Sequence, residues 1–277
     1  MKMRKLLLTA LAMAAIACSK SDEVQMIDAP EGMGIVSFSV MPTLAVEGTR
    51  AQVNLPEGTT IPAGGDFALQ ILKNESTGYD GGTWVSVATF NENYKKTYFV
   101  QGYYNAIVTY GNPSEEGVNK PFFKGDFSYN IIARQKTDIT IPAKLANSIV
   151  KVEFSDRFKK YFENGANITI STENETDGVK NKWTVDYSSS PYIFVESGKK
   201  VTIAGTATKQ RPSATVEPEV VTFDNVEKNL APCTLYTYRY DVSTAGSVSV
   251  SIAIFNEPTE IIGVSDGEEM NDDAIVN

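Results

Sequence analysis

Apolar and polar residues alternate with period two along most of the chain. Val36, Phe38 and Val40 would point to one side, while Ser37 and Ser39 point to the other. This alternation indicates a β-strand with one buried face. The same alternation, or a short run of β-forming residues, predicts further strands at residues 67–72, 84–90, 103–110, 127–132, 137–141, 149–154, 168–171, 183–187, 192–195, 201–208, 220–223, 235–241 and 248–255.

Helical periodicity is nearly absent, and its best candidate is residues 156–162. There Asp156 would cap the start, while Phe158, Tyr161 and Phe162 share one face. No alternation of strands with helices is visible, so a parallel nucleotide-binding sheet has no support. We therefore expect an all-β fold with one short accessory helix.

The predicted strands divide into two groups. Turn signals such as Gly64-Gly65 and Asn164-Gly165 separate them at the spacing of antiparallel sandwiches. The segment from Pro142 to Leu145 lies between two predicted strands and is the best candidate for a boundary. We predict two tandem antiparallel β-sandwich domains, at residues 34–145 and 146–277, the second with an acidic end. The sequence shows no internal repeat.

The first residues have the pattern of a secretory signal. Residues 1–17 combine a positively charged start with an uncharged run at residues 6–17 and small residues before Cys18. Twelve helical residues reach about 18 Å, short of the roughly 30 Å hydrocarbon core, so a permanent span is not expected. An ordinary signal cut near Ala17 is the alternative to acylation of Cys18.

Small residues followed by Cys18 resemble the lipobox of bacterial lipoproteins, in which that thiol is acylated. Residues 18–33 would then form a lipidated polar tether, and two or more acyl chains give stable anchoring. The polar tract also resembles the export tag of lipoproteins that reach the outer face of the outer membrane in Bacteroides-type bacteria. The expected location is the outer membrane, lipid-anchored and facing the cell exterior.

Composition and charge narrow the classes of partner. The chain of 277 residues is 42% hydrophobic, as expected of a folded protein, and its net charge is −9. This acidic balance argues against nucleic-acid binding, which needs basic side chains at phosphates. If Cys18 is acylated, no internal disulfide is expected, and Cys233 is predicted to be a buried core residue.

The sequence contains no histidine. Its absence removes the Ser-His-Asp and Cys-His nucleophile systems, histidine zinc sites and the commonest general base. No phosphate-binding loop or dinucleotide glycine pattern occurs either. We therefore predict a protein that is not an enzyme, with no catalytic residues, no metal site and no cofactor.

Aromatic residues suggest one kind of ligand. Trp84, Trp183, Tyr103 and Tyr104 are candidates for glycan contact, because exposed aromatic faces often bind sugars. The alternative is that they fill the core, since aromatic residues favour strands. Alternation lets only one of Tyr103 and Tyr104 point inward.

Arg50 is a candidate processing site. It lies in the polar stretch 48–51, the kind of segment that proteases cut. Cleavage there would release the strand at residues 35–41 and open an edge that a strand of another subunit can fill. The alternative is an uncut loop arginine.

Four segments support a family resemblance. They are YNAIVTYG at residues 104–111, KPFFKG at 120–125, KLAN at 144–147 and VEFSD at 152–156. In this order they resemble an uncharacterised lipoprotein family of Bacteroidales, a domain of unknown function allied to the fimbrillin-like proteins. The resemblance implies two transthyretin-like β-sandwiches displayed on the cell surface. Fimbrillins lose an N-terminal strand after an arginine and polymerise by strand exchange, and Arg50 is similar to that site.

Three functional hypotheses follow. The first is a non-enzymatic outer-membrane surface lipoprotein, anchored through Cys18, that presents two sandwiches for adhesion or for binding a ligand or partner. The second is a fimbrial subunit or anchor, assembled by strand exchange after cleavage at Arg50. The third is a glycan-binding surface module. The expected partners are the membrane, other surface proteins and glycans.

Overall fold

Strands dominate the protein. The computed structural model describes residues 26–43, 59–73, 81–173, 180–210, 215–243, 247–254 and 260–263. The prediction of an all-β fold is confirmed. Two short α-helices, α1 (Val87–Asn93) and α2 (Asp156–Tyr161), accompany the strands where one was expected, together with two 3₁₀ turns at Gly64–Asp66 and Tyr94–Lys96. No helix in these residue ranges is both long enough and apolar enough to cross a membrane.

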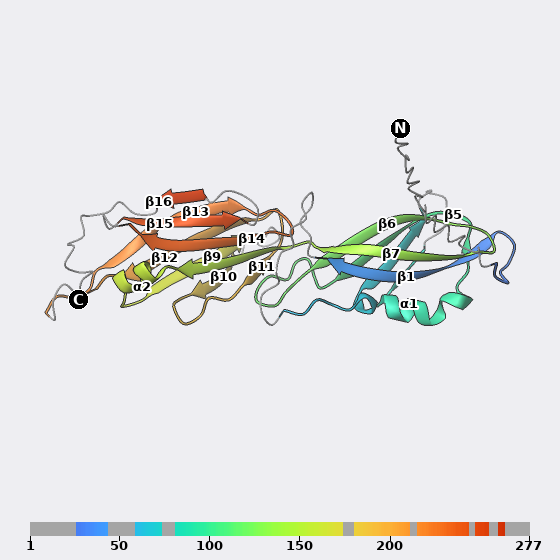
Figure 1. Cartoon of the computed structure of the whole chain (residues 1–277), viewed down its shortest axis with the longest axis horizontal. Coiled ribbons are helices and arrows are strands. Elements are labelled where there is room, and N and C mark those ends of the chain that lie inside the picture. The colour runs from blue at the N-terminus through green and yellow to red at the C-terminus, as the bar shows by residue number, and fades with distance from the viewer. Residues whose placement is uncertain are drawn as a thin grey trace, which may run out of the picture.

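The strands form two groups that we call the N half and the C half. The N half consists of β1 (Met33–Thr43), β2 (Ala68–Lys73), β3 (Gly82–Trp84), β4 (Phe99–Val100), β5 (Gly102–Tyr110), β6 (Phe123–Ile131) and β7 (Lys136–Leu145). The C half consists of β8 (Ser148–Phe154), β9 (Ala166–Glu173), β10 (Lys180–Val185), β11 (Ile193–Val195), β12 (Lys200–Thr208), β13 (Val220–Asn229), β14 (Leu235–Val242), β15 (Val248–Ile254) and β16 (Glu260–Gly263). Figure 1 shows the two halves end to end along the long axis.

Each half encloses its own core. In the N half the strand order is β3-β2-β5-β6-β7-β1-β4, and only two residue pairs join β6 to β7. The C half has one sheet of order β10-β9-β12-β13 and another of order β11-β8-β14-β15-β16. One apolar cluster combines residues of β1, β2 and β5, and a second combines residues of β8, β9, β12 and β14. Inward-facing side chains from two layers of strands therefore form each core, as in a β-sandwich.

The two halves have the same topology. The order β3-β2-β5-β6 in the N half matches β10-β9-β12-β13 in the C half, strand for strand in chain order. The order β7-β1-β4 likewise matches β14-β8-β11, and β15 and β16 extend the C half beyond this common unit. The protein therefore contains the same seven-stranded unit twice. No repeat is visible in the sequence.

Most strand pairs are antiparallel, as predicted, but each half also contains one parallel pair that the sequence did not predict. β1 pairs in parallel with β7 over nine residues, and β8 pairs in parallel with β14. In each half the first strand lies beside the last, and five strands of the repeat separate them along the chain. Such a long connection permits a parallel pair, which a tight hairpin cannot form.

The prediction of a strand at residues 84–90 was wrong. β3 ends at Trp84, and α1 begins at Val87 with Ser86 as its N-cap, whose hydroxyl accepts a hydrogen bond from the Thr89 main-chain N–H. Val87 and Phe90, three residues apart, are the buried residues of this helix. Capping and helical spacing therefore outweigh the β propensity of valine and phenylalanine.

The second helix was predicted, but its cap was misplaced by one residue. α2 begins at Asp156, and the cap is Ser155, whose hydroxyl accepts from the Phe158 N–H at 3.0 Å. Phe158 and Phe162 are buried against the C-half core, as their shared face predicts.

A buried carboxylate joins the two halves. Glu116, in the loop between β5 and β6, has a fully buried side chain. It accepts hydrogen bonds from the Thr172 hydroxyl at 2.5 Å and the Asn181 amide at 2.8 Å, and it lies 3.2 Å from Lys199 Nζ. All three partners belong to the C half. The loop of the N half is therefore held inside the C half by several directed contacts.

Main-chain contacts complete this junction. Gly117 and Phe194 exchange two N–H···O bonds of 2.9 Å, so the loop extends the edge of β11. The buried Asn147 side chain, between β7 and β8, accepts from the Phe122 N–H and donates to the Lys120 carbonyl. Ile149, Phe194 and Cys233 pack with the N-half core, so Cys233 is a buried core residue as predicted.

Candidate functional site

The structure does not bring the four aromatic residues predicted for glycan contact together. Trp84 is half-buried in the N half, with its ring edge-to-face on Phe90 at 4.8 Å. Trp183 is half-buried on β10 and packs against the C-half core. The two tryptophans therefore belong to different halves and to different cores.

Tyr103 and Tyr104 point to opposite faces of β5. Tyr103 is 58% exposed, whereas Tyr104 is fully buried and its hydroxyl donates to the Val100 carbonyl at 2.7 Å. Tyr104 packs on Phe99 and Tyr129, so its ring has no surface for a ligand. This pair contributes only Tyr103 to the surface, as the alternation along the strand requires.

Two predicted site residues, Cys18 and Arg50, lie outside the described residues, as does the acidic end after residue 263. No group of three or more Cys, Asp or Glu side chains that suits a metal ion occurs within the described ranges. The clefts of the two halves are therefore the remaining candidate sites.

One cleft among the described residues lies along the free edge of β8. We call it the β8 groove; it has a volume of about 380 Å³ and is lined by residues 151–156, Lys159, Asp186, Tyr187, Ser190 and Arg239. The start of the described chain lies far from it, because Met26 bridges Gln135 at the outer end of β7, ten residues from the junction. The groove therefore lies in the half that does not contain the start of the described chain.

The main chain of β8 has one side free at this groove. Its odd-numbered residues bond to β14, as the bonds from the Ile149 and Ser155 N–H groups to Thr234 and Tyr240 show. The even-numbered residues face the other side, where β11 pairs only as far as Val150. The main-chain groups of Val152 and Phe154 therefore point toward the groove.

The N half contains the equivalent edge, on β1. In the N half, Gly34 pairs with Phe99 of β4, and Phe38 lies four residues further along β1. In the C half, Val150 pairs with Ile193 of β11, and Phe154 lies four residues further along β8. Phe38 and Phe154 therefore occupy equivalent positions. The Phe38 ring packs edge-to-face on Phe90 at 5.2 Å, and the Phe154 ring packs edge-to-face on Tyr187 at 5.0 Å. The repeat therefore extends to individual side chains.

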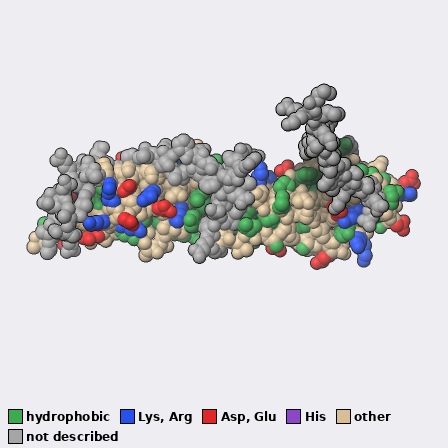
Figure 2. Space-filling view, in the orientation of Figure 1, with side chains coloured by type: hydrophobic (Ala, Val, Ile, Leu, Met, Phe, Trp, Pro, Cys, Tyr) green, Lys and Arg blue, Asp and Glu red, His purple; other side chains and the backbone are tan. Residues whose placement is uncertain are grey.

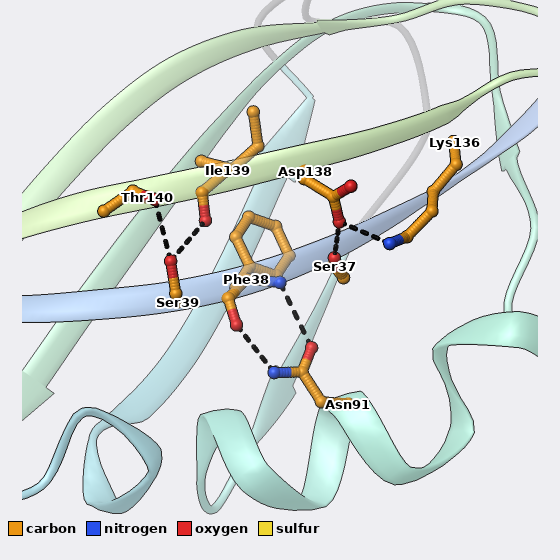
Figure 3. Close-up of polar contacts among 8 residues, drawn as sticks. All are labelled: Ser37, Phe38, Ser39, Asn91, Lys136, Asp138, Ile139 and Thr140. Atoms are coloured by element: carbon orange, nitrogen blue, oxygen red, sulfur yellow. Dashed lines mark hydrogen bonds and ion pairs between the residues drawn. The ribbon is translucent and has the colours of Figure 1, made fainter. Parts of the chain in front are cut away.

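The two edges differ in what covers them. The Asn91 side chain of α1 accepts a hydrogen bond from the Phe38 N–H at 3.1 Å and donates one to the Phe38 carbonyl at 2.6 Å (Figure 3). In the C half the segment between β10 and β11 forms a turn instead of a helix. No described residue bonds to the main-chain N–H or carbonyl of Phe154, and Ser190 donates only to the Val152 carbonyl.

A turn centred on Asp186 shapes the outer wall of the groove. One carboxylate oxygen of Asp186 accepts from the N–H groups of Ser188 and Ser189, both at 2.8 Å, and from the Ser188 hydroxyl. These hydrogen bonds hold the pKa of Asp186 below its usual value, since they favour the charged form. Asp186 is therefore ionised at neutral pH and keeps the turn in place.

The charges around the groove balance. Lys151, Lys159 and Arg239 oppose Glu153, Asp156 and Asp186. Burial lowers the pKa of Lys151, but hydrogen bonds to Tyr192 and Glu153 outweigh it and hold the pKa above its ordinary value. The visible face of the C half likewise mixes both signs of charge (Figure 2). The groove therefore has no strong preference for an ionic ligand.

Two other clefts among the described residues are smaller. One of about 340 Å³ includes Tyr110, Asn119 and Lys120 beside the junction loop, and one of about 320 Å³ includes Tyr94, Tyr98 and Lys136 at the outer end of the N half. In the second, Lys136 Nζ lies 5.4 Å from the centre of the Tyr94 ring and 2.7 Å from Asp138. The β8 groove has an equivalent edge in the other half, which Asn91 covers. Neither of these two clefts can be compared with an equivalent site in this way.

Sequence reasoning did not find the β8 groove, because no motif marks it. Its floor is main chain, and its existence follows from a helix that is present in one half and absent in the other. The sequence contains one signal for it. Ser86 before Val87 and Phe90 is a helix-start pattern that predicts α1, the helix that carries Asn91 to Phe38.

The fold and the groove define a protein of two repeated β-sandwiches, in which the second sandwich has an open cleft at the edge that a helix covers in the first. The chain belongs to the family of the domain of unknown function DUF4493, whose model matches residues 32–266. This match supports the expected domain of unknown function; kinship with fimbrillins and lipidation stay predictions. No curated protein matches the chain.

Several solved structures resemble the fold. A "putative cell adhesion protein" from Bacteroides uniformis is 12% identical over 81% of this chain and 99% of that chain, with a TM-score of 0.41. One from Bacteroides eggerthii is 8% identical over 83% and 97%, with a TM-score of 0.40. One of the "putative polysaccharide binding proteins" of Bacteroides thetaiotaomicron is 10% identical over 80% and 98%, with a TM-score of 0.41. Likeness at this level says nothing about function.

Proposed function

We propose that this protein is a surface lipoprotein, anchored to the outer membrane through Cys18, that binds a partner or ligand outside the cell through the β8 groove. It has no enzymatic activity in this proposal, which the absence of histidine supports. The observation that carries the proposal is the Phe154 main chain, which faces a cleft without a hydrogen-bond partner among the described residues. Polar main-chain groups at such a position are suited to a ligand.

Fatty-acid labelling of cells tests the anchor. The wild-type protein should take up label and Cys18→Ala should not, and protease added to intact cells should degrade the labelled protein. An unlabelled wild-type protein, or a labelled one that resists protease until the cells are lysed, contradicts the proposed location.

An array of immobilised peptides and glycans tests binding. The wild-type protein should bind at least one ligand, and Ser190→Trp should lose that binding because the indole fills the groove. Ser189→Trp is the matched control, since Ser189 is exposed and does not line the groove. Absence of binding, or equal binding by wild type and Ser190→Trp, contradicts the assignment of the groove.

A fimbrial subunit assembled by strand exchange is the second candidate. The observation in its favour is the position of β1, which places Val36, Phe38 and Val40 in the N-half core, so that its loss after cleavage at Arg50 would leave an apolar slot for another strand. N-terminal sequencing of protein from native cells decides between the candidates. A blocked Cys18 supports the anchored lipoprotein, and a free Ala51 supports the fimbrial subunit.

A further inference from the structure

The edge of β1 shows which chemical group completes this kind of site. Phe38 presents a donor and an acceptor from one residue, and the Asn91 carboxamide satisfies both. Its oxygen accepts and its NH₂ donates, with both groups directed to the same side (Figure 3). The N half therefore contains a bound primary amide, supplied by its own chain.

Phe154 offers the same pair of groups without an amide. It has the strand position of Phe38, its ring meets an aromatic partner in the same edge-to-face manner, and its N–H and carbonyl face the β8 groove. We infer that the β8 groove recognises a primary carboxamide, the side chain of an asparagine or glutamine of a protein partner. This inference rests on the proposed function and names the chemistry of its ligand.

Other small groups fit the Phe154 main chain less well. A carboxylate has no proton for the carbonyl, and an ammonium group has no acceptor for the N–H. A secondary amide such as the acetamido group of an amino sugar is trans, so its oxygen and N–H point in opposite directions and only one of them engages Phe154. The balanced charges at the rim also favour a neutral group.

Titration of the ¹⁵N-labelled protein with small probes tests the inference. Propanamide should move the main-chain amide resonance of Phe154, while that of Phe38 stays in place because Asn91 occupies it. N-methylacetamide should bind about fivefold more weakly, because it makes one hydrogen bond fewer. Propanoate should leave Phe154 unmoved.

Two variants serve as controls. Asn91→Ala removes the internal amide, so the Phe38 resonance should become sensitive to propanamide, and propanamide should raise the melting temperature of this variant more than that of the wild type. Ser190→Trp should abolish the response of Phe154. If propanamide moves Phe38 in Asn91→Ala but leaves Phe154 unmoved in the wild type, the method works and the inference is wrong.

Peptides distinguish the source of the amide. Ala-Ala-Asn-Ala-Ala should move Phe154, and the same peptide with aspartate in place of asparagine should not. A larger response to N-acetylglucosamine than to the asparagine peptide overturns the inference in favour of a glycan. Failure of the inference leaves the proposed function standing if the arrays still show ligand binding that Ser190→Trp abolishes.

Discussion

At the scale of single residues, two tyrosines on β14 show how burial and hydrogen bonding are balanced. Tyr236 and Tyr240 are both buried in the C-half core. The Tyr236 hydroxyl accepts from the Ala231 N–H at 2.8 Å, whereas the Tyr240 hydroxyl has no hydrogen-bond partner among the described residues. Burial accordingly raises the pKa of Tyr240 above its usual value.

Removal of the Tyr240 hydroxyl should stabilise the protein. Tyr240→Phe keeps the ring contacts and eliminates a buried polar group, so the free energy of unfolding should rise by about 1 kcal/mol. Tyr236→Phe is the matched control and should lower it by about 1 kcal/mol, because it leaves the Ala231 N–H unpaired. Urea unfolding measures both, and a Tyr240→Phe variant less stable than the wild type contradicts this account.

The sequence contained most of the information about single positions in the strands. Alternation correctly placed Val36, Phe38 and Val40 in the core and predicted that only one of Tyr103 and Tyr104 is exposed. It did not distinguish exposed from half-buried tryptophan, because alternation does not show which side chains pack against Trp84 and Trp183. The importance of Asn91 was equally hidden, since its partner Phe38 lies 53 residues away.

At the scale of elements, β1 is held by polar contacts on both edges. Toward β7, the Ser37 hydroxyl donates to Asp138, which also lies 2.7 Å from Lys136 Nζ, and Ser39 pairs with Thr140 at 2.8 Å (Figure 3). On the other edge Asn91 holds Phe38. These contacts fix the register of a strand that no hairpin connects to its neighbour.

The contact at Asp138 predicts a dependence of stability on pH. Partial burial raises the pKa of Asp138, but hydrogen bonds from Lys136 and Ser37 outweigh it and hold the pKa below its usual value. Because the native state then binds fewer protons than the unfolded chain, this contribution is full above about pH 5 and is lost as the pH falls through the lowered pKa. The stability gap between wild type and Asp138→Asn should therefore shrink below about pH 4.

Urea unfolding of both proteins from pH 7 down to pH 2.5 measures that gap. Asp126→Asn is a suitable control, because Asp126 is an exposed strand residue whose side chain makes no hydrogen bond or ion pair with the described residues. A gap between wild type and Asp138→Asn that stays constant over this range excludes a role for the Asp138 carboxylate.

Most elements were predictable, and the exceptions have physical reasons. Long strands such as β5 and β12 show clear alternation, whereas β3, β4 and β16 contain four residues or fewer, too short for a pattern. The helix α1 buries only Val87 and Phe90. Two buried residues give a weak helical pattern, and valine and phenylalanine also favour strands, so a strand was predicted there. Strand direction left no trace in the alternation, and the parallel pairs β1–β7 and β8–β14 were missed.

At the scale of the whole molecule, the junction decides whether the two halves behave as one unit. Glu116 is fully buried and bonded to three side chains of the C half. Its neighbour Glu115 makes a half-exposed ion pair with Lys120, within the N half. The two acids are adjacent in sequence, but their burial and their partners give them different structural roles.

Loss of the Glu116 carboxylate should uncouple the halves. Glu116→Ala should lower the free energy of unfolding by about 3 kcal/mol, because a hydrogen-bonded buried charge pair is broken. In calorimetry the single transition expected of the wild type should separate into two. Glu115→Ala, which removes an exposed ion pair, should change stability by less than about 1 kcal/mol and keep one transition. One transition in Glu116→Ala argues against a coupling role.

The repeat itself was invisible in the sequence. Topology depends on which strands become neighbours, and different side chains fill the two cores, so the halves share strand order without visible sequence similarity. The candidate site follows from that repeat, because at the β8 groove the C half lacks the helix that covers the equivalent edge of β1 in the N half. A single half, or the sequence alone, would not have revealed it.

Amide hydrogen exchange at Phe38 and Phe154 tests the central claim most directly. If the β8 groove is the unfilled counterpart of the edge that Asn91 covers, the Phe154 N–H should exchange roughly a hundredfold or more faster than the Phe38 N–H. The Glu153 N–H, which faces β14, should remain protected beside it. Equal protection of Phe38 and Phe154 would mean that the Phe154 N–H already has a partner, and would contradict the assignment of the groove as a binding site.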